Sequence, residues 1–329
     1  MTSPTLGGAR SSLSLSDRAV AGGFGAAWRV LPAMPARMAY GMFADIASAT
    51  YIKGGGSVAQ MRRNYARARP ELSPNALEAL VRRGVESYMR YWCEAFRLPG
   101  LNDQQLRANV RSVGDAPIRE SLANGEPVIG FVPHMGNWDA AGAWASANMA
   151  PVVTVMENLE PENVLRGFMR LREQRGIIPY PLTDSSEVLR KLMSHLDKPH
   201  ILSLLGDRDL TGGGVEVDFL GGRASFAMGP AVLALRSTGR VVPITVHYEP
   251  VERSVWPSGY RSVVTFHDPV VDPGTGRTRD RIAAMTQGCA DVLGTHIRAH
   301  TENWHMMQPV FLDDPAHPAN RAAAPPTSG

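Results

Sequence analysis

A histidine and an aspartate lie five positions apart, directly after a short apolar run. Residues 127–133 (PVIGFVP) predict a buried strand, which delivers His134 to a sheet edge, and Asp139 falls in the first turns of a following helix. The Asp139 carboxylate can reach back to one ring nitrogen and fix the tautomer, which leaves the other nitrogen as a general base for an incoming hydroxyl. The pair alone fits a purely structural role equally well. His134 would then be a hydrogen-bonded polar residue without a catalytic role, and Asp139 an acid that stabilises a helix N-terminus.

More acidic residues follow the apolar HILSLL segment at 200–205. Asp207, Arg208 and Asp209 come directly after it, and the alternating VEVDF segment puts Glu216 and Asp218 on one face of a strand. In a parallel sheet these groups would lie beside the histidine, and Glu216 or Asp218 could be a second partner of its ring. Arg208 fits an internal salt bridge as well as a substrate contact.

Other chemistries find less support. The three glycines at 212–214 are not followed by Lys-Ser/Thr, so a nucleotide P-loop is not indicated, and neither G-x-S-x-G nor H-E-x-x-H occurs. The nine histidines form no tight cluster along the chain, and the two cysteines, Cys93 and Cys289, are far apart, so we expect no metal site and no disulfide framework. Two alternative functions remain. One is a metal-dependent hydrolase using His134, Asp139, Asp207 and Asp209. A second is a non-catalytic lipid-binding protein, and the role of His305 stays open.

The remaining pattern predicts an α/β fold. Apolar runs that read as strands alternate with segments of helical periodicity, which implies a mainly parallel central sheet flanked by helices on both faces. The strands are expected at 127–133, 152–156, 177–180, 200–205, 215–220, 241–248 and 261–266. The helices are expected at 73–98, 137–149, 162–175, 185–196, 228–238 and 278–300. Ligands of such sheets bind beyond the carboxyl ends of the strands.

The chain ends are expected to differ from this core, which we place at 73–313. Residues 1–17 are predicted to be flexible, 18–72 to form a helical extension, and 314–329 to be a disordered tail. Within the extension, 18–52 carries few charges and fits either a membrane-surface pair of short amphipathic helices or a pair packed on the protein's own core. No run approaches the roughly 18 apolar residues of a membrane span. A net charge of +3 is too small to indicate nucleic-acid binding.

Several sequence blocks together resemble a known family. The region 62–312 is similar to the lipid A biosynthesis acyltransferase superfamily, and within it to the actinobacterial branch that acylates phosphatidylinositol mannosides. The resemblance rests on six blocks in the same order, YWCEAFRLP (91–99), HMGNWD (134–139), DRDLT (207–211), GVEVDF (214–219), MGPA (228–231) and WHMMQP (304–309). His-x4-Asp by itself is a weak signal, whereas six ordered blocks are a strong one.

The resemblance implies a glycerolipid acyltransferase-like α/β fold with an apolar groove and a cleft for coenzyme A. It implies transfer of a long-chain acyl group, palmitoyl in particular, from acyl-CoA to a mannose 6-hydroxyl of phosphatidylinositol mono- or dimannoside. Acyl-CoA is then a co-substrate, and no cofactor is expected. The enzyme would sit peripherally on the cytoplasmic face of the plasma membrane. The implied catalytic residues are His134 as base, Asp139 and Glu216, and the implied substrate contacts are Asn137, Trp138, Arg208 and Arg223.

This sequence departs from the family pattern at several positions. Met135 stands where Ser is common, Asp207 where Glu is common, and Asn158 where a basic residue is usual. Ser225 stands where the family commonly has Arg, although this chain has an arginine, Arg223, two residues earlier. These differences bear on donor length and acceptor identity more than on the reaction, so acylation of another glycolipid stays open.

Overall fold

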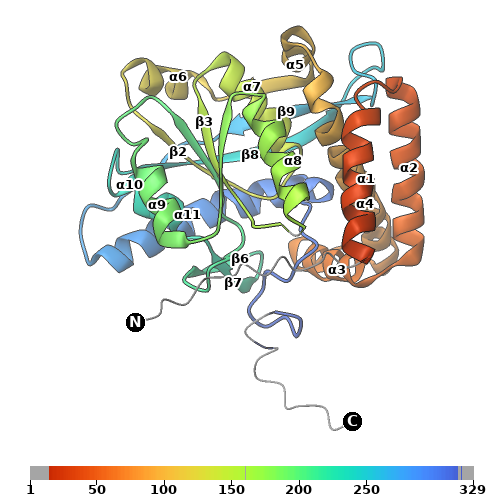
Figure 1. The fold of residues 1–329 in the computed structure, drawn as a ribbon. Helices are drawn as coiled ribbons and strands as arrows, with labels where there is room; N and C mark the ends of the chain where they lie inside the picture. Colours follow the sequence, from red (N-terminus) through yellow and green to blue (C-terminus); the bar gives the residue numbers. More distant parts are fainter. Residues whose placement is uncertain (1–14, 160, 318–319, 321–329) are drawn as a thin grey trace, which may run out of the picture.

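The central feature of the fold is a mainly parallel sheet, seen in the computed structural model, which describes residues 15–159, 161–317 and 320 (Figure 1). Its strands lie in the order β1 (Val110–Val113), β9 (Tyr260–Phe266), β8 (Arg240–Pro250), β2 (Val128–Val132), β5 (Ile201–Leu205), β3 (Val152–Met156) and β4 (Ile177–Pro181), with β10 (Val270–Val271) also paired to β8. The β8–β9 and β8–β10 pairs are antiparallel, and the other pairs between described strands of this sheet are parallel. The predicted α/β class is confirmed.

Helices cover both faces of this sheet and make two separate cores. One core holds apolar side chains of α9 (Ser185–Met193), α10 (Gly229–Ala234) and α11 (Thr278–Ala299). The other holds side chains of α5 (Asp103–Asn109), α6 (Ala116–Ala123), α7 (Trp138–Asn148) and α8 (Glu162–Glu173). Since β2 is buried along its whole length, its sequence is continuously apolar rather than alternating, as strands covered on both faces are.

One predicted strand lies outside the central sheet. Segment 215–220 forms a separate antiparallel hairpin, β6 (Val215–Phe219) with β7 (Gly222–Phe226), turning at Leu220 (φ 49°) and Gly221 (φ 79°). Its apolar positions are buried against α11, whereas its charged positions face solvent. The hairpin therefore separates Glu216 from the strands that carry the histidine motif.

The N-terminal extension is helical and packs on the protein's own core. It comprises α1 (Leu15–Val30), α2 (Ala36–Lys53) and α3 (Gly56–Ala68), which join α4 (Pro74–Arg97) beside the sheet (Figure 1). Ser73 caps α4 by accepting the N–H of Ala76, as expected of Ser before Pro. Phe24 of α1 packs edge-on against Trp92 and Phe168, and Trp28 packs edge-on against Phe168. Of the flexible start expected at 1–17, residues 1–14 lie outside the described ones. No helix among the described residues is long and apolar enough to cross a bilayer.

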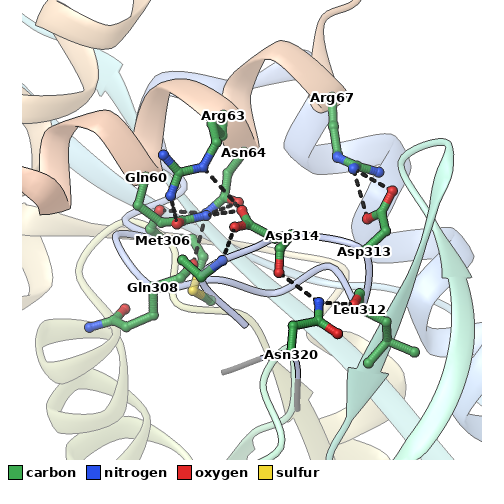
Figure 2. A network of polar contacts seen from close by, with 11 residues as sticks. Gln60, Arg63, Asn64, Arg67, Met306, Gln308, Leu312, Asp313, Asp314 and Asn320 are labelled. Carbon is green, nitrogen blue, oxygen red and sulfur yellow. Dashed lines mark hydrogen bonds and ion pairs between the residues drawn. The ribbon is translucent and has the colours of Figure 1, made fainter. Parts of the chain in front are cut away.

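The segment after α11 is fastened to α3 by a polar network (Figure 2). The Asn64 amide nitrogen donates to the carbonyl oxygens of Met306 and Gln308, both at 2.9 Å. Gln60 donates to Asp314 at 2.7 Å, and this carboxylate also pairs with Arg63. Asp314 is only 5% exposed. The chain is thus tied down at 314, the first residue of the tail expected to be disordered, while 318–319 and 321–329 lie outside the described residues.

Replacing Asn64 by Ala should destabilise the fold, because the buried carbonyl of Met306 and the part-buried carbonyl of Gln308 lose their donor. Unsatisfied buried polar groups cost about 1–3 kcal/mol each, so the free energy of unfolding should fall by about 2–4 kcal/mol in urea denaturation. Asn75→Ala, at an exposed position of α4, is the matched control and should change it by less than about 0.5 kcal/mol. Equal stability of the two variants would contradict a clamping role for Asn64.

Candidate active site

The adjacent parallel strands β2 and β5 bring His134 and Asp207 together. Val132 is in register with Leu205, and each of the two residues follows its strand end by two positions. The Nδ1 of His134 lies 2.6 Å from Oδ1 of Asp207, and the backbone N–H of His134 donates to Oδ2 at 3.0 Å. An ionised Asp207 accepts a hydrogen bond from the Nδ1–H group, so Nε2 is the ring nitrogen left to act as a base.

Asp207 is fully buried, and its carboxylate is satisfied from two directions. Besides both His134 donors, it accepts the indole N–H of Trp304 at 3.0 Å. Burial alone would raise the pKa of Asp207, but His134 and the three N–H donors outweigh burial and hold this pKa below its ordinary value. A charged acid at this position stabilises the imidazolium that forms when the ring takes a proton.

The turn carrying His134 is held by backbone contacts to the 303–305 segment. The N–H of His305 donates to the His134 carbonyl, and the N–H of Gly136 donates to the Asn303 carbonyl, both at 2.8 Å. Gly136 has φ 60°, and a Cβ there would lie 2.5 Å from the carbonyl oxygen of Val246. Only glycine fits both the left-handed conformation and this close approach.

His134 opens onto a cleft of about 210 Å³, and its side chain is 21% exposed. The walls combine aromatic and aliphatic side chains with a few polar groups. The lining residues are Tyr88, Tyr91, Trp92, Trp138, Val155, Met156, Glu157, Leu159, Phe168, Arg172, Leu205, Arg208, His305 and Gln308. A mostly apolar wall with polar groups near one imidazole is typical of sites that bind an apolar substrate and react at its polar end.

Comparison with known proteins identifies the family of this chain. Residues 17–313 match the family model described as bacterial lipid A biosynthesis acyltransferase. The chain belongs to this family. A Mycolicibacterium smegmatis protein named phosphatidylinositol mannoside acyltransferase is 34% identical over 89% of this chain and 91% of its own. A Mycobacterium tuberculosis protein of the same name is 32% identical over 88% of both chains. The protein is thus an acyltransferase, as the sequence blocks predicted.

In this acyltransferase, Asp139 does not contact the histidine of its own motif, contrary to our expectation. Its carboxylate accepts the Tyr91 hydroxyl at 2.9 Å and the Arg172 Nε–H at 2.7 Å. Both partners line the cleft. The carboxylate points away from the strand end because Asp139 is in the first turn of α7, on the side packed against α4 and α8. Asp139 therefore holds the cleft wall.

Asn137 and Trp138, expected to bind substrate, have different surroundings. Asn137 caps α7 by accepting the N–H of Ala140, and its amide donates to the buried Glu94 at 2.8 Å. Burial raises the pKa of Glu94 above its ordinary value, although hydrogen bonds from Asn137 and two tyrosines oppose the shift. Trp138 lines the cleft, with its ring 5.8 Å from that of His134. Only Trp138 of the two is therefore placed against the cleft.

Glu216 and Arg223 lie together on the β6–β7 hairpin, outside the cleft. Arg223 donates to Glu216 at 2.9 Å and lies 3.6 Å from Asp218, so the predicted shared face of the two acids is confirmed. No hydrogen bond or ion pair joins Glu216 to His134 in the described part of the chain. The expectation that Glu216 supports the imidazole is thus not met by the geometry. Asp207 occupies that place.

Arg208 forms a salt bridge, one of the two roles that the sequence left open, and it also faces the cleft. It lines the cleft, and its Nη2 pairs with Glu157 at 2.5 Å. Its Nε is buried without a partner. Since buried donors are rarely left unpaired, this nitrogen marks a place where a bound substrate can supply the missing acceptor.

The set proposed for a metal-dependent hydrolase does not converge. Asp139 is occupied by Tyr91 and Arg172, and Asp207 by His134 and Trp304. Asp209 instead accepts N–H groups of Thr211 and Gly214 within its own loop. Among the described residues, the three carboxylates thus have separate partners and do not share one site.

Sequence reasoning missed two groups at the site. Asp207 was considered as part of an acidic run, as a possible metal ligand and as a departure from the family pattern, but not as the main partner of the imidazole, although its position after a neighbouring apolar strand was a usable signal. His305 lies in the WHMMQP block and proves to be on the cleft wall, where burial lowers its pKa to about 3 and keeps the ring neutral. Its Nε2 is 3.0 Å from the Ser87 hydroxyl, and its Nδ1 is buried without a partner.

Asp139→Asn should lower the free energy of unfolding by about 3–5 kcal/mol, because Arg172 would be left buried without its counter-charge. Urea denaturation measures this loss. Asp218→Asn, at a side chain that is 81% exposed, is the matched control and should stay within about 0.5 kcal/mol of the parent protein. Unchanged stability together with lost activity would mean that Asp139 acts in the chemistry itself.

Proposed function

We propose that this acyltransferase moves a long-chain acyl group, palmitoyl in particular, from acyl-CoA to a mannose 6-hydroxyl of phosphatidylinositol mono- or dimannoside. The observation that carries the proposal is the pairing of His134 with the buried Asp207 beside an apolar cleft. The names of both mycobacterial relatives support the acceptor class. Acylation of a different glycolipid is the alternative.

The reaction needs one base and no covalent enzyme intermediate. Nε2 of His134 takes the proton of the acceptor hydroxyl as its oxygen attacks the thioester carbonyl carbon. The C–S bond then breaks, and the coenzyme leaves as a thiol after receiving that proton from the imidazolium. Asp207 stabilises the positive ring in between, as the acid of a Ser-His-Asp triad does. A positioned base of this kind contributes about 10²–10⁴-fold to the rate.

Two groups on the cleft wall are suited to contact the reacting carbonyl. Arg208 and His305 each line the cleft and each carry a buried nitrogen without a partner. If Ser87 donates its hydroxyl proton to Nε2 of His305, Nδ1 carries a hydrogen that can donate. Donors arranged before the reaction stabilise the oxyanion without reorganisation, which is usually the largest catalytic contribution.

The size of the cleft limits what it can enclose. About 210 Å³ is below the roughly 300–1,000 Å³ usual for pockets that enclose a small molecule. The cleft can therefore hold the thioester end of the donor and part of its chain, with Trp92, Leu159 and Phe168 as apolar contacts. The remaining lipid has to lie against the protein surface or in a membrane.

We propose that α2 contacts that membrane, on the cytoplasmic face, where acyl-CoA, too polar to cross a bilayer, is found. Met38, Met42 and Ile46 recur at four-residue spacing and are 62%, 38% and 40% exposed. This spacing aligns them along one side of the helix, while the other side is buried against α4. The two roles considered for 18–52, membrane contact and packing on the core, are therefore compatible. The same helix packs on the core with one side and presents an apolar stripe on the other.

His134→Ala should lower kcat for palmitoyl transfer by about 10²–10⁴-fold, and Asp207→Asn by about 10²-fold or more, because the wrong tautomer is then favoured. Glu216→Gln, at an exposed acid on the hairpin, is the matched control and should stay within about twofold. Release of free thiol from palmitoyl-CoA gives the rates. An inactive Glu216→Gln beside an active Asp207→Asn would overturn the assignment of the supporting acid.

Thiol release from palmitoyl-CoA also distinguishes the proposed acceptor from other lipids, and an acyltransferase from a lipid-binding protein. Thiol release should rise at least about tenfold when a mannosylated phosphoinositide is added, and the product should carry one new ester on mannose. Binding of palmitoyl-CoA without thiol release would indicate the lipid-binding protein instead. Equal stimulation by an unmannosylated lipid would contradict the acceptor.

Changing Met38, Met42 and Ile46 together to Ser should reduce the vesicle-bound fraction of the protein by about tenfold, because each exposed apolar side chain stabilises membrane contact. Co-sedimentation with phosphatidylinositol-containing vesicles measures it. Val271→Ser, at an exposed apolar side chain on β10, controls for general loss of hydrophobicity. Unchanged binding of the α2 variant would show that another surface meets the lipid.

A further inference from the structure

Four of the nine histidines gather at the C-terminal end of α11, away from the cleft, contrary to the expectation that the histidines would not cluster. His247 comes from β8, His267 directly follows β9, and His296 and His300 lie one helical turn apart. Ring centroids are 5.1 Å apart for His247 and His296, and 4.8 Å for His296 and His300. Residues four apart share one face of a helix, so His296-x3-His300 was a signal that the sequence offered.

We propose that His247, His296 and His300 form a binding site for a divalent transition-metal ion of the zinc class. One ligand nitrogen from each ring lies within 4.8 Å of the others. Nδ1 of His247 and Nε2 of His296 are 3.2 Å apart. Two nitrogens bound to one tetrahedral Zn²⁺ are separated by about 3.3 Å, given Zn–N bonds of about 2.0–2.1 Å. This pair already has the required spacing.

The third ligand needs a local adjustment. The His300 ring is stacked on His247, with centroids 3.8 Å apart and planes at 17°, so it has to turn about its side-chain bonds to point at the same ion. Its position permits this turn, because His300 is the residue at which the chain leaves α11. All three side chains are half-buried, so an ion can enter from solvent.

The chemistry of the surroundings selects the class of metal. No carboxylate forms an ion pair with any of these three rings in the part of the chain that the structure describes. The nearby acid Glu249 is instead taken by Arg111 at 2.7 Å. A set made only of imidazoles suits Zn²⁺, Ni²⁺ or Cu²⁺ and not Mg²⁺ or Ca²⁺, which prefer oxygen. His267 lies beside His296 at 5.3 Å between ring centroids, but its Nε2 is 2.8 Å from the Thr245 hydroxyl, so the proposed ligands are the other three histidines.

Such an ion would fasten the central sheet to the start of the segment that reaches the active site. His300 precedes Trp304, the Asp207 partner, by four residues, and Asn303 already accepts the backbone N–H of Tyr248, the neighbour of His247, at 3.0 Å. The bound ion would therefore stabilise the position of this segment against the sheet. It contributes no group to the cleft.

The test is a Zn²⁺ titration of tag-free, chelator-treated protein by calorimetry, with Mg²⁺ as the negative control. One Zn²⁺ should bind per chain and raise Tm by on the order of 3–5 °C at saturation. His296→Gln and His300→Gln should each weaken binding by about tenfold or more. Bound Co²⁺ should show the visible absorption of tetrahedral coordination, and this absorption should be lost in both variants.

The matched control is His195→Gln/His200→Gln, which removes the other close imidazole pair, with Nδ1 atoms 2.8 Å apart. This variant should bind Zn²⁺ like the parent protein. The proposal is overturned if Zn²⁺ does not saturate at one site, or if the two α11 variants, shown to be folded by circular dichroism, bind as tightly as the parent. It is also overturned if only the control variant or His134→Ala loses the ion.

Discussion

The buried charge of Asp207 is the constraint on which the rest of the site depends. A carboxylate without exposure is tolerated only where donors converge on it, because an unpaired buried charge costs several kcal/mol. Two donors come from His134 on the neighbouring strand and one from Trp304, 97 positions along the chain. Strand register, the turn at Gly136 and the path of the C-terminal segment must all be correct at once. The imidazole's tautomer and direction then follow.

The His-x4-Asp spacing has a different physical meaning from the one its sequence suggests. The two residues are only five positions apart, yet the first helical turn carries the Asp139 carboxylate away from the ring and into a pair with Arg172. That pair joins α7 to α8 and, through Tyr91, to α4. The motif thus combines a reactive group with the support of the wall beside it. Loss of activity on changing either residue would not by itself distinguish the two roles.

The sequence predicted the scaffold better than the contacts. Continuous apolar runs such as 128–132 could be recognised because strands covered on both faces need no polar alternation. The short edge strand β1 gave no such run, since three of its four residues are not fully buried. The choice between Asp139, Asp207 and Glu216 depended on facts that are not local: which strand neighbours β2, and that the VEVDF segment leaves the sheet for a hairpin. Asp139 was the expected partner of His134 because it is close in sequence. Asp207 is the actual partner because its strand, β5, is the neighbour of β2.

The segment 300–314 connects the active site to α3 and α11. It begins at the histidine cluster on α11, supplies the Trp304 bond to Asp207 and the His305 ring to the cleft, and ends where Asp314 meets α3. The Tyr65 hydroxyl donates to the Trp304 carbonyl at 2.9 Å, so the helix that secures the segment also fixes the residue that holds the catalytic acid. The N-terminal extension is therefore part of the active-site framework, even though none of α1, α2 or α3 supplies a residue to the cleft lining. Helix α2 packs on this framework and presents apolar side chains outward. A surface that binds these side chains therefore lies at a fixed position relative to the active site.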